Sequence, residues 1–129
     1  MDNKEHSSET YKSMISISVE ALKSLLLING GATVAMLSFL GASSRGATLV
    51  SHAYLPLSSF TSGIVFSVLA FACSYATQYA LFNETLRPNV YKGPRHMTFV
   101  GWGLLFVFLG LVAFAVGCIS SISALTHIS

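Results

Sequence analysis

Three long uncharged runs, each predominantly apolar, dominate the pattern of this chain. They lie within residues 24–44, within 46–83 and from 97 onward. A bilayer with a hydrocarbon core of about 30 Å is crossed by about 20 apolar residues in a helix. Each run is predicted to be a helix because a backbone in lipid has no water to satisfy its polar groups. The pattern therefore predicts an all-α, polytopic membrane protein with three transmembrane helices.

The expected organisation is a single membrane domain over residues 1–129. Pro56 is predicted to lie where the second helix begins, because proline is tolerated in a first helical turn. The expected segments are an N-terminal segment 1–23, transmembrane helices at about 24–42, 57–82 and 98–120, loops 43–56 and 83–97, and a short tail 121–129.

Residues 1–23 mix both charges with many serines, and apolar residues recur at helical spacing from Tyr11 onward. This pattern favours a cytoplasmic helical extension. The extension either lengthens the first transmembrane helix or lies on the membrane surface. A cleaved signal peptide is disfavoured because the apolar run that follows is too long for one.

Composition supports the same class of protein. Hydrophobic residues make up 53% of the chain and charged residues only 9%, whereas soluble domains carry about 25% charged residues. A water-soluble fold is therefore excluded. The formal net charge of +2 comes with no basic stripe, so no nucleic-acid partner is expected.

Basic residues are distributed unevenly between the two sides of the predicted bundle. The N-terminal segment carries three, the first loop only Arg45, and the second loop Arg87, Lys92 and Arg95. The positive-inside rule then predicts a cytoplasmic N-terminus and an external C-terminus, in a bacterial inner membrane. The second loop is either a topogenic segment touching anionic lipid or a docking site for a cytosolic protein.

Small residues form a stripe on each predicted helix, and such stripes allow helices in lipid to approach closely. Two interpretations stay open: packing within one chain, or a contact between copies, for which the glycine heptad of the third helix is the favoured surface. The stripes are Gly31, Ala35 and Ser38; Gly63 and Ser67; and Gly103, Gly110 and Gly117.

The predicted spans contain no charged residue, and their most polar side chains are Asn29, Thr33 and Gln78. Asn29 and Gln78 are predicted at a similar depth, where they could hydrogen-bond. At 100° per residue, Asn29 and Thr33 lie opposite the stripe of Gly31. The first helix thus has two faces that avoid lipid, one of which is expected to meet a second subunit or water. The alternative is an asparagine satisfied by neighbouring backbone.

No catalytic residues, metal ligands or cofactor site are predicted, because no suitable constellation of side chains is present. Cys73 and Cys118 are expected at different depths and therefore unpaired. The chain is expected not to be an enzyme. In size and number of spans it resembles the phage holins as a class.

Two hypotheses of function follow. The first is a self-associating membrane protein that forms a pore or perturbs the bilayer, of channel, holin-like or defence-effector type. The second is an accessory or anchor subunit that recruits a cytosolic partner to the membrane.

Overall fold

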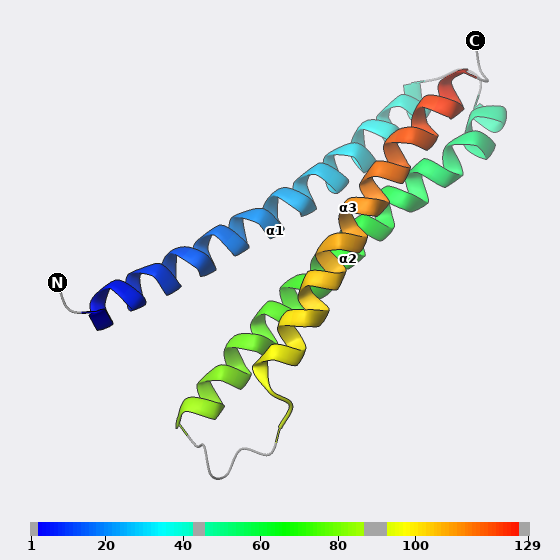
Figure 1. The fold of residues 1–129 in the computed structure, drawn as a ribbon. Helices are drawn as coiled ribbons and strands as arrows, with labels where there is room; N and C mark the ends of the chain where they lie inside the picture. The colour runs from blue at the N-terminus through cyan, green and yellow to red at the C-terminus, as the bar shows by residue number, and fades with distance from the viewer. Residues whose placement is uncertain (1–2, 43–45, 87–92, 127–129) are drawn as a thin grey trace.

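The computed structural model describes residues 3–42, 46–86 and 93–126, and these form three long helices that run up, down and up (Figure 1). They are α1 (Asn3–Ala42), α2 (Gly46–Leu86) and α3 (His96–Thr126). Each helix contains a stretch long and apolar enough to cross a membrane. The predicted all-α membrane fold is therefore confirmed.

The helices are longer than a bilayer requires. At 1.5 Å per residue, α1 and α2 are each about 60 Å long and α3 about 46 Å, against a hydrocarbon core of about 30 Å. The candidate spans within them are Glu9–Ala42, His52–Leu86 and His96–Ala124. The bundle must therefore tilt in the membrane or project beyond the hydrocarbon.

The N-terminal segment continues into the first transmembrane helix, since α1 runs without a break from Asn3 to Ala42. Toward its N-terminus α1 diverges from the α2–α3 pair (Figure 1). From Glu9 to Ala21 the helix is exposed apart from the half-buried Ile15 and Val19, and Glu20 pairs with Lys23 at 2.8 Å on its surface. Of the two alternatives for this segment, the structure adopts the extended helix.

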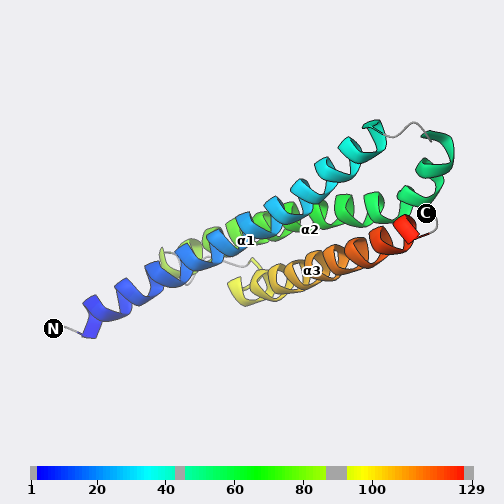
Figure 2. The same ribbon diagram turned by 90° about the horizontal axis from the view of Figure 1, so that it is seen from above.

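Pro56 lies ten residues inside α2, and the prediction that it begins the helix was wrong because α2 already begins at Gly46. Proline removes one backbone hydrogen bond of the helix and bends it. The helix visibly changes direction in its first part (Figure 2). The hydroxyls of Ser58 and Ser59 donate to the Leu55 carbonyl at 2.9 and 2.8 Å, so side chains supplement the backbone bonding next to the bend.

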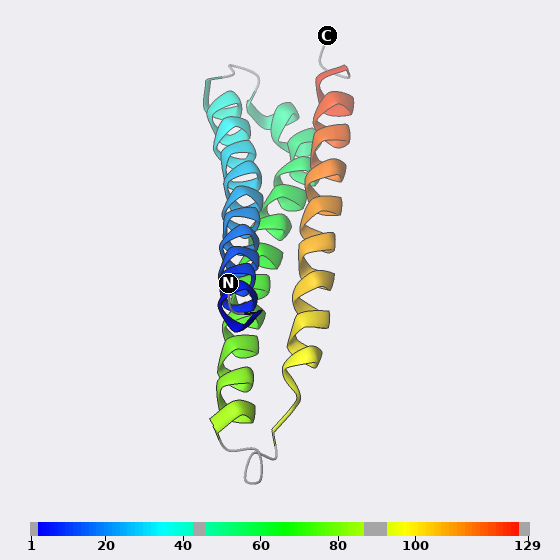
Figure 3. The ribbon, with the colours of Figure 1, turned by 60° about the vertical axis from the view of Figure 1, so that its left-hand side comes forward.

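The helices α2 and α3 pack along each other, whereas α1 lies mainly against α2 and touches α3 little (Figure 3). Two aromatic pairs join α2 to α3, with ring centroids 5.9 Å apart for Phe60–Phe114 and 6.3 Å for Phe66–Phe106. Most other buried residues are small. Close approach of backbones, rather than a thick apolar core, therefore holds the bundle together.

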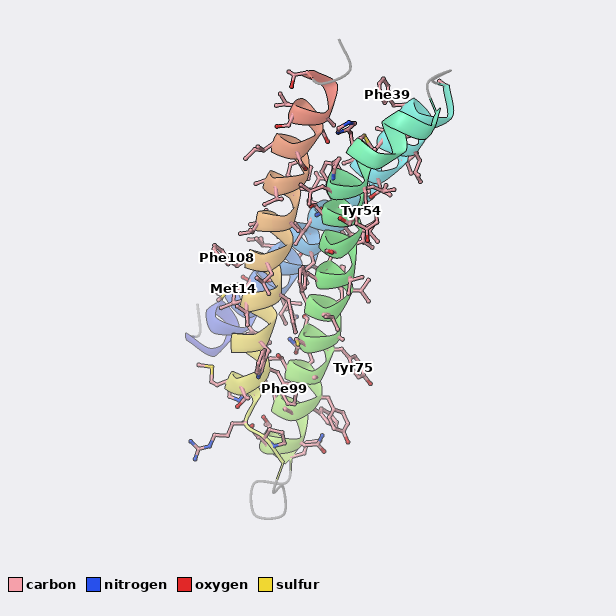
Figure 4. All side chains as sticks on the ribbon, turned by 90° about the vertical axis from the view of Figure 1, so that its right-hand side faces the viewer. Met14, Phe39, Tyr54, Tyr75, Phe99 and Phe108 are labelled. Atoms are coloured by element: carbon pink, nitrogen blue, oxygen red, sulfur yellow. The ribbon has the colours of Figure 1, made fainter. Side chains whose placement is uncertain are left out.

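Large apolar side chains cover the outside of the bundle. Phe108 is 63% exposed and Tyr54 and Tyr75 are each 75% exposed, and all three point away from the helices (Figure 4). In water the exposure of so much apolar surface would be unfavourable, but in a bilayer this surface faces apolar lipid chains. The surface is therefore that of an integral membrane protein.

Candidate functional site

Asn29 occupies the point where the three helices meet. Its side chain is fully buried, and Leu22 and Leu25 on the same face of α1 are 6% and 4% exposed. The spacing of these three residues, three and then four, is that of one helical face. The face of α1 that carries Asn29 is therefore the one that packs inside the chain.

The Asn29 carboxamide lies over Gly63 of α2. A Cβ added to Gly63 would overlap the carboxamide, so only glycine at this position lets Asn29 approach so closely. From the opposite side, a Cβ on Gly110 of α3 would lie 3.7 Å from the Gly63 carbonyl oxygen and 3.0 Å from Cδ2 of Leu25. Ser67, also fully buried, donates to the same carbonyl at 2.8 Å. Gly63 is thus the centre of the junction.

Only one half of the Asn29 carboxamide is hydrogen-bonded. Nδ2 donates to the Leu25 carbonyl at 3.0 Å, and Oδ1 has no hydrogen-bond partner among the described residues. A buried amide oxygen without a hydrogen bond costs about 1–3 kcal/mol. Oδ1 lies beside the Cα–H group of Gly63, a weak donor that offsets part of this cost. Thr33, half-buried one turn later, donates to the Asn29 carbonyl at 2.9 Å.

Gln78 does not pair with Asn29. Asn29 faces Gly63, which lies 15 residues before Gln78 and so about 22 Å from it along α2. Gln78 is exposed and accepts a hydrogen bond of 3.3 Å from the Tyr11 hydroxyl. The predicted common depth was wrong because the antiparallel register of α1 and α2 places Asn29 opposite Gly63 and Tyr11 beside Gln78.

The small residues of α1 face outward. Gly31, Ala35 and Ser38 are exposed, and a Cβ added to Gly31 would meet no described atom within 4 Å. Val34, next to the stripe, is 63% exposed. We call Gly31, Ala35 and Ser38 the outer face of α1. No helix of the described chain covers it.

The glycine heptad of α3, in contrast, faces α2 within the same chain. A Cβ on Gly103 would lie 3.5 Å from the Cβ of Cys73, an ordinary contact, whereas one on Gly117 would overlap the ring of Phe60. Gly110 and Gly117 are buried. The heptad therefore serves packing within the chain, which was one of its two interpretations.

The Glu84 carboxylate joins the C-terminal end of α2 to the N-terminal end of α3. Glu84 accepts from the backbone N–H of His96 at 2.8 Å through Oε1, and its Oε2 lies 2.7 Å from His96 Nδ1. The contact caps the first turn of α3 and becomes an ion pair when the imidazole is protonated. This contact was not predicted from the sequence; the signal for it is an acid in the last turn of one helix followed by a histidine at the start of the next.

The predicted basic loop is only partly described. Arg95 is exposed, one residue before α3 begins. Arg87 and Lys92 lie outside the described residues. The loop therefore stays a predicted contact for anionic lipid or a cytosolic protein.

Chemistry-bearing side chains are scattered over the bundle. Cys73 and Cys118 are both free thiols, as predicted. Within 3–42, 46–86 and 93–126, no three His, Cys, Asp or Glu side chains gather in a way that could hold a metal ion. The features left to carry function are thus the three-helix junction and the outer face of α1.

Comparison with known proteins adds no relative. No protein-family model, no curated protein and no solved structure matches this chain.

Proposed function

We propose that the chain self-associates in the membrane through the outer face of α1, and that the assembly opens a pore or perturbs the bilayer. One observation carries the proposal. Of the three small-residue stripes, that of α1 is the one that the helices of the chain leave uncovered.

The energetics of membranes make this face suitable for a second copy. Helices in lipid gain little from apolar burial against each other, so association depends on van der Waals contact and hydrogen bonds at close approach. Gly31 and Ala35 permit such an approach, and Ser38 supplies a hydroxyl. A second α1 laid against the same face would form a symmetric contact, because identical surfaces meet in a two-fold dimer.

The small-residue stripes of α2 and α3 are less suitable for contact with a second copy. Gly63, Gly110 and Gly117 are already covered by Asn29, Leu25 and Phe60 of the same chain. A substitution at Gly110 would therefore disturb the fold of one chain before it disturbed assembly. Gly31 offers a cleaner test.

The test compares Gly31→Leu with Gly101→Leu. Both glycines lie open, with no described atom within 4 Å of an added Cβ, so both variants keep the fold of the single chain. We expect Gly31→Leu to shift the protein from oligomer to monomer in native mass spectrometry of bilayer nanodiscs. Gly101→Leu should retain the oligomer of the unaltered chain. Equal assembly in both variants would refute the interface.

The pore is tested separately with a membrane-potential dye during inducible expression in bacteria. Depolarisation that is lost in Gly31→Leu and kept in Gly101→Leu supports a pore built by assembly. Assembly without depolarisation leaves the interface standing and rejects the pore. We expect no catalytic activity, and we expect the bacterial inner membrane as the location, with the N-terminus cytoplasmic.

An anchor for a cytosolic protein is the second candidate, and the shape of α1 favours it. The helix carries Glu9, Lys12, Glu20 and Lys23, all exposed, and its N-terminal part diverges from α2 and α3 (Figure 1). A rigid, charged arm of this kind suits a partner with complementary charges. Capture of one cytosolic protein by the unaltered chain, but not by Lys12→Glu, would support it; capture by neither would reject it.

A further inference from the structure

Exposed aromatic residues mark two levels along the bundle. Tyr54 and Tyr75 both point outward from α2 (Figure 4), and they are about 32 Å apart along it at 1.5 Å per residue. Trp102 of α3, also exposed, lies close to the level of Tyr75 because Gly103 packs against Cys73. Tyrosine and tryptophan favour the boundary between lipid and water, and the hydrocarbon core is about 30 Å thick. The hydrocarbon therefore lies between the levels of Tyr54 and Tyr75.

The register of α1 against α2 gives the depth of Glu20. Two contacts fix this register: the Asn29 carboxamide lies over Gly63, and the Tyr11 hydroxyl donates to Gln78. Glu20 is midway between Tyr11 and Asn29 along α1, so it is level with about residue 70 of α2. This level is about 7 Å closer to the bilayer centre than the nearer of the two aromatic levels.

Glu20 forms an ion pair at this depth on the outside of the bundle. Lys23 donates to Oε1 of Glu20 at 2.8 Å, and the two side chains are 56% and 67% exposed. The bond uses one carboxylate oxygen and one of the three ammonium protons. Charged side chains in hydrocarbon are costly and pair with other protein groups. The remaining hydrogen-bonding capacity of the pair is thus available to a second protein surface.

The ion pair belongs to the same side of α1 as the outer face. At 100° per residue, Glu20 and Ser24 lie within about 20° of Gly31 around the helix, and all three are exposed. Lys23 lies beside Glu20 at the edge of this side. A second copy that contacts the outer face of α1 therefore meets the ion pair as well.

We propose that Glu20 and Lys23 of one copy bind the same two residues of a second copy, an inference that rests on the proposed self-association through the outer face of α1. Copies inserted in the same direction carry the pair at the same depth, and each ammonium group donates to the carboxylate of the other copy. The surface is complementary to itself because it carries both signs of charge. A lipid phosphate accepts from Lys23 but repels Glu20, so it does not complete the pair.

The test is a reversal and exchange of the charges, with assembly measured by native mass spectrometry of bilayer nanodiscs. Glu20→Lys places two ammonium groups from each copy at one depth in the hydrocarbon, and it should shift the oligomer to monomer. Both side chains are exposed, so the fold of the single chain is kept. The exchanged variant Glu20→Lys/Lys23→Glu carries both signs again and should recover the oligomer.

The matched control lies on the same helix. Glu9 and Lys12 are exposed, have the same spacing and occupy the same side of α1. Glu9 lies beyond Tyr11 toward the N-terminus, however, and therefore beyond the aromatic level and in water. Glu9→Lys should keep the oligomer of the unaltered chain, because water solvates the added charge.

The outcomes separate the ion pair from the interface on which it depends. An oligomer in Glu20→Lys together with a monomer in Gly31→Leu would reject the ion-pair contact and leave the outer face as the interface. Failure of the exchanged variant to recover assembly would also overturn the contact between opposite charges. Equal loss of assembly in Glu9→Lys and Glu20→Lys would overturn the assigned depth. A monomeric unaltered chain would refute both the interface and the contact.

Discussion

Aromatic pairs and a ring packed on Gly117 hold α2 to α3, whereas α1 is held to α2 chiefly around Asn29. The first interface is a matter of shape: Phe60 fills the space left by Gly117 and packs on Phe114 at 5.9 Å. The second places a polar carboxamide on a glycine. Both interfaces depend on close approach of the helices. Only the second buries a polar oxygen, Oδ1 of Asn29, without a hydrogen-bond partner among the described residues.

The difference teaches how each interface responds to change. A shape-based contact distributes its energy over many atoms and resists the loss of any one of them. A contact centred on one side chain depends on that residue and its glycine. We therefore expect α1 to be the more readily displaced helix.

The largest loss of stability is expected from a substitution of Gly117, in the α2–α3 interface. In Gly117→Ala the added methyl group overlaps the buried ring of Phe60, and overpacking of this kind costs about 1–3 kcal/mol. SDS-titration unfolding, followed by the fluorescence of Trp102, measures the change in stability. The matched control is Gly103→Ala in the same heptad, where the methyl group fits at 3.5 Å from Cys73. Equal loss of stability in both variants would contradict the packing described.

A smaller effect, confined to α1, is expected from Gly63→Ala. The methyl group displaces the Asn29 carboxamide, at a cost of about 1–2 kcal/mol, and α1 moves away from α2. Spin labels on α1 and α2 measure the separation. In the double variant Gly63→Ala/Asn29→Ala the methyl group has room. The change in the separation of α1 and α2 should therefore be smaller than the sum of the changes in the two single variants.

The same measurement has an internal control. Ser67→Ala alters the same buried face of α2 but removes only a hydrogen bond within that helix, so it should leave α1 in place. Strict additivity of Gly63→Ala and Asn29→Ala would show that the two residues do not depend on each other.

The smallest effect is expected at Tyr11. Tyr11→Phe removes the 3.3 Å hydrogen bond to Gln78, which is exposed and contributes about 0.5 kcal/mol. Stability should hardly change, but the distance distribution between labels at the N-terminal part of α1 and the end of α2 should broaden. Tyr75→Phe, an exposed tyrosine on the outside of α2 (Figure 4), is the control and should leave that distribution unchanged.

Prediction from the sequence succeeded where lipid constrains the chain. Uncharged runs of sufficient length must be helices in a bilayer, and the low charge content left no soluble alternative. The small-residue stripes were also visible, because helical periodicity assigns residues to faces. Prediction failed at Pro56, since proline is compatible both with a first turn and with a bent helix interior when serine hydroxyls supplement the backbone bonding.

The sequence by itself determined that this protein is three apolar helices with a small-residue stripe on each and two separate non-lipid faces on the first. Only the tertiary structure decided that Asn29 points inward onto Gly63 and that Gly31, Ala35 and Ser38 point outward. The physical reason is that helical periodicity assigns residues to faces but does not determine which face a neighbouring helix covers. Which face is buried depends on the shape of the partner helix, and Gly63 of α2 is the position that leaves room for the Asn29 carboxamide.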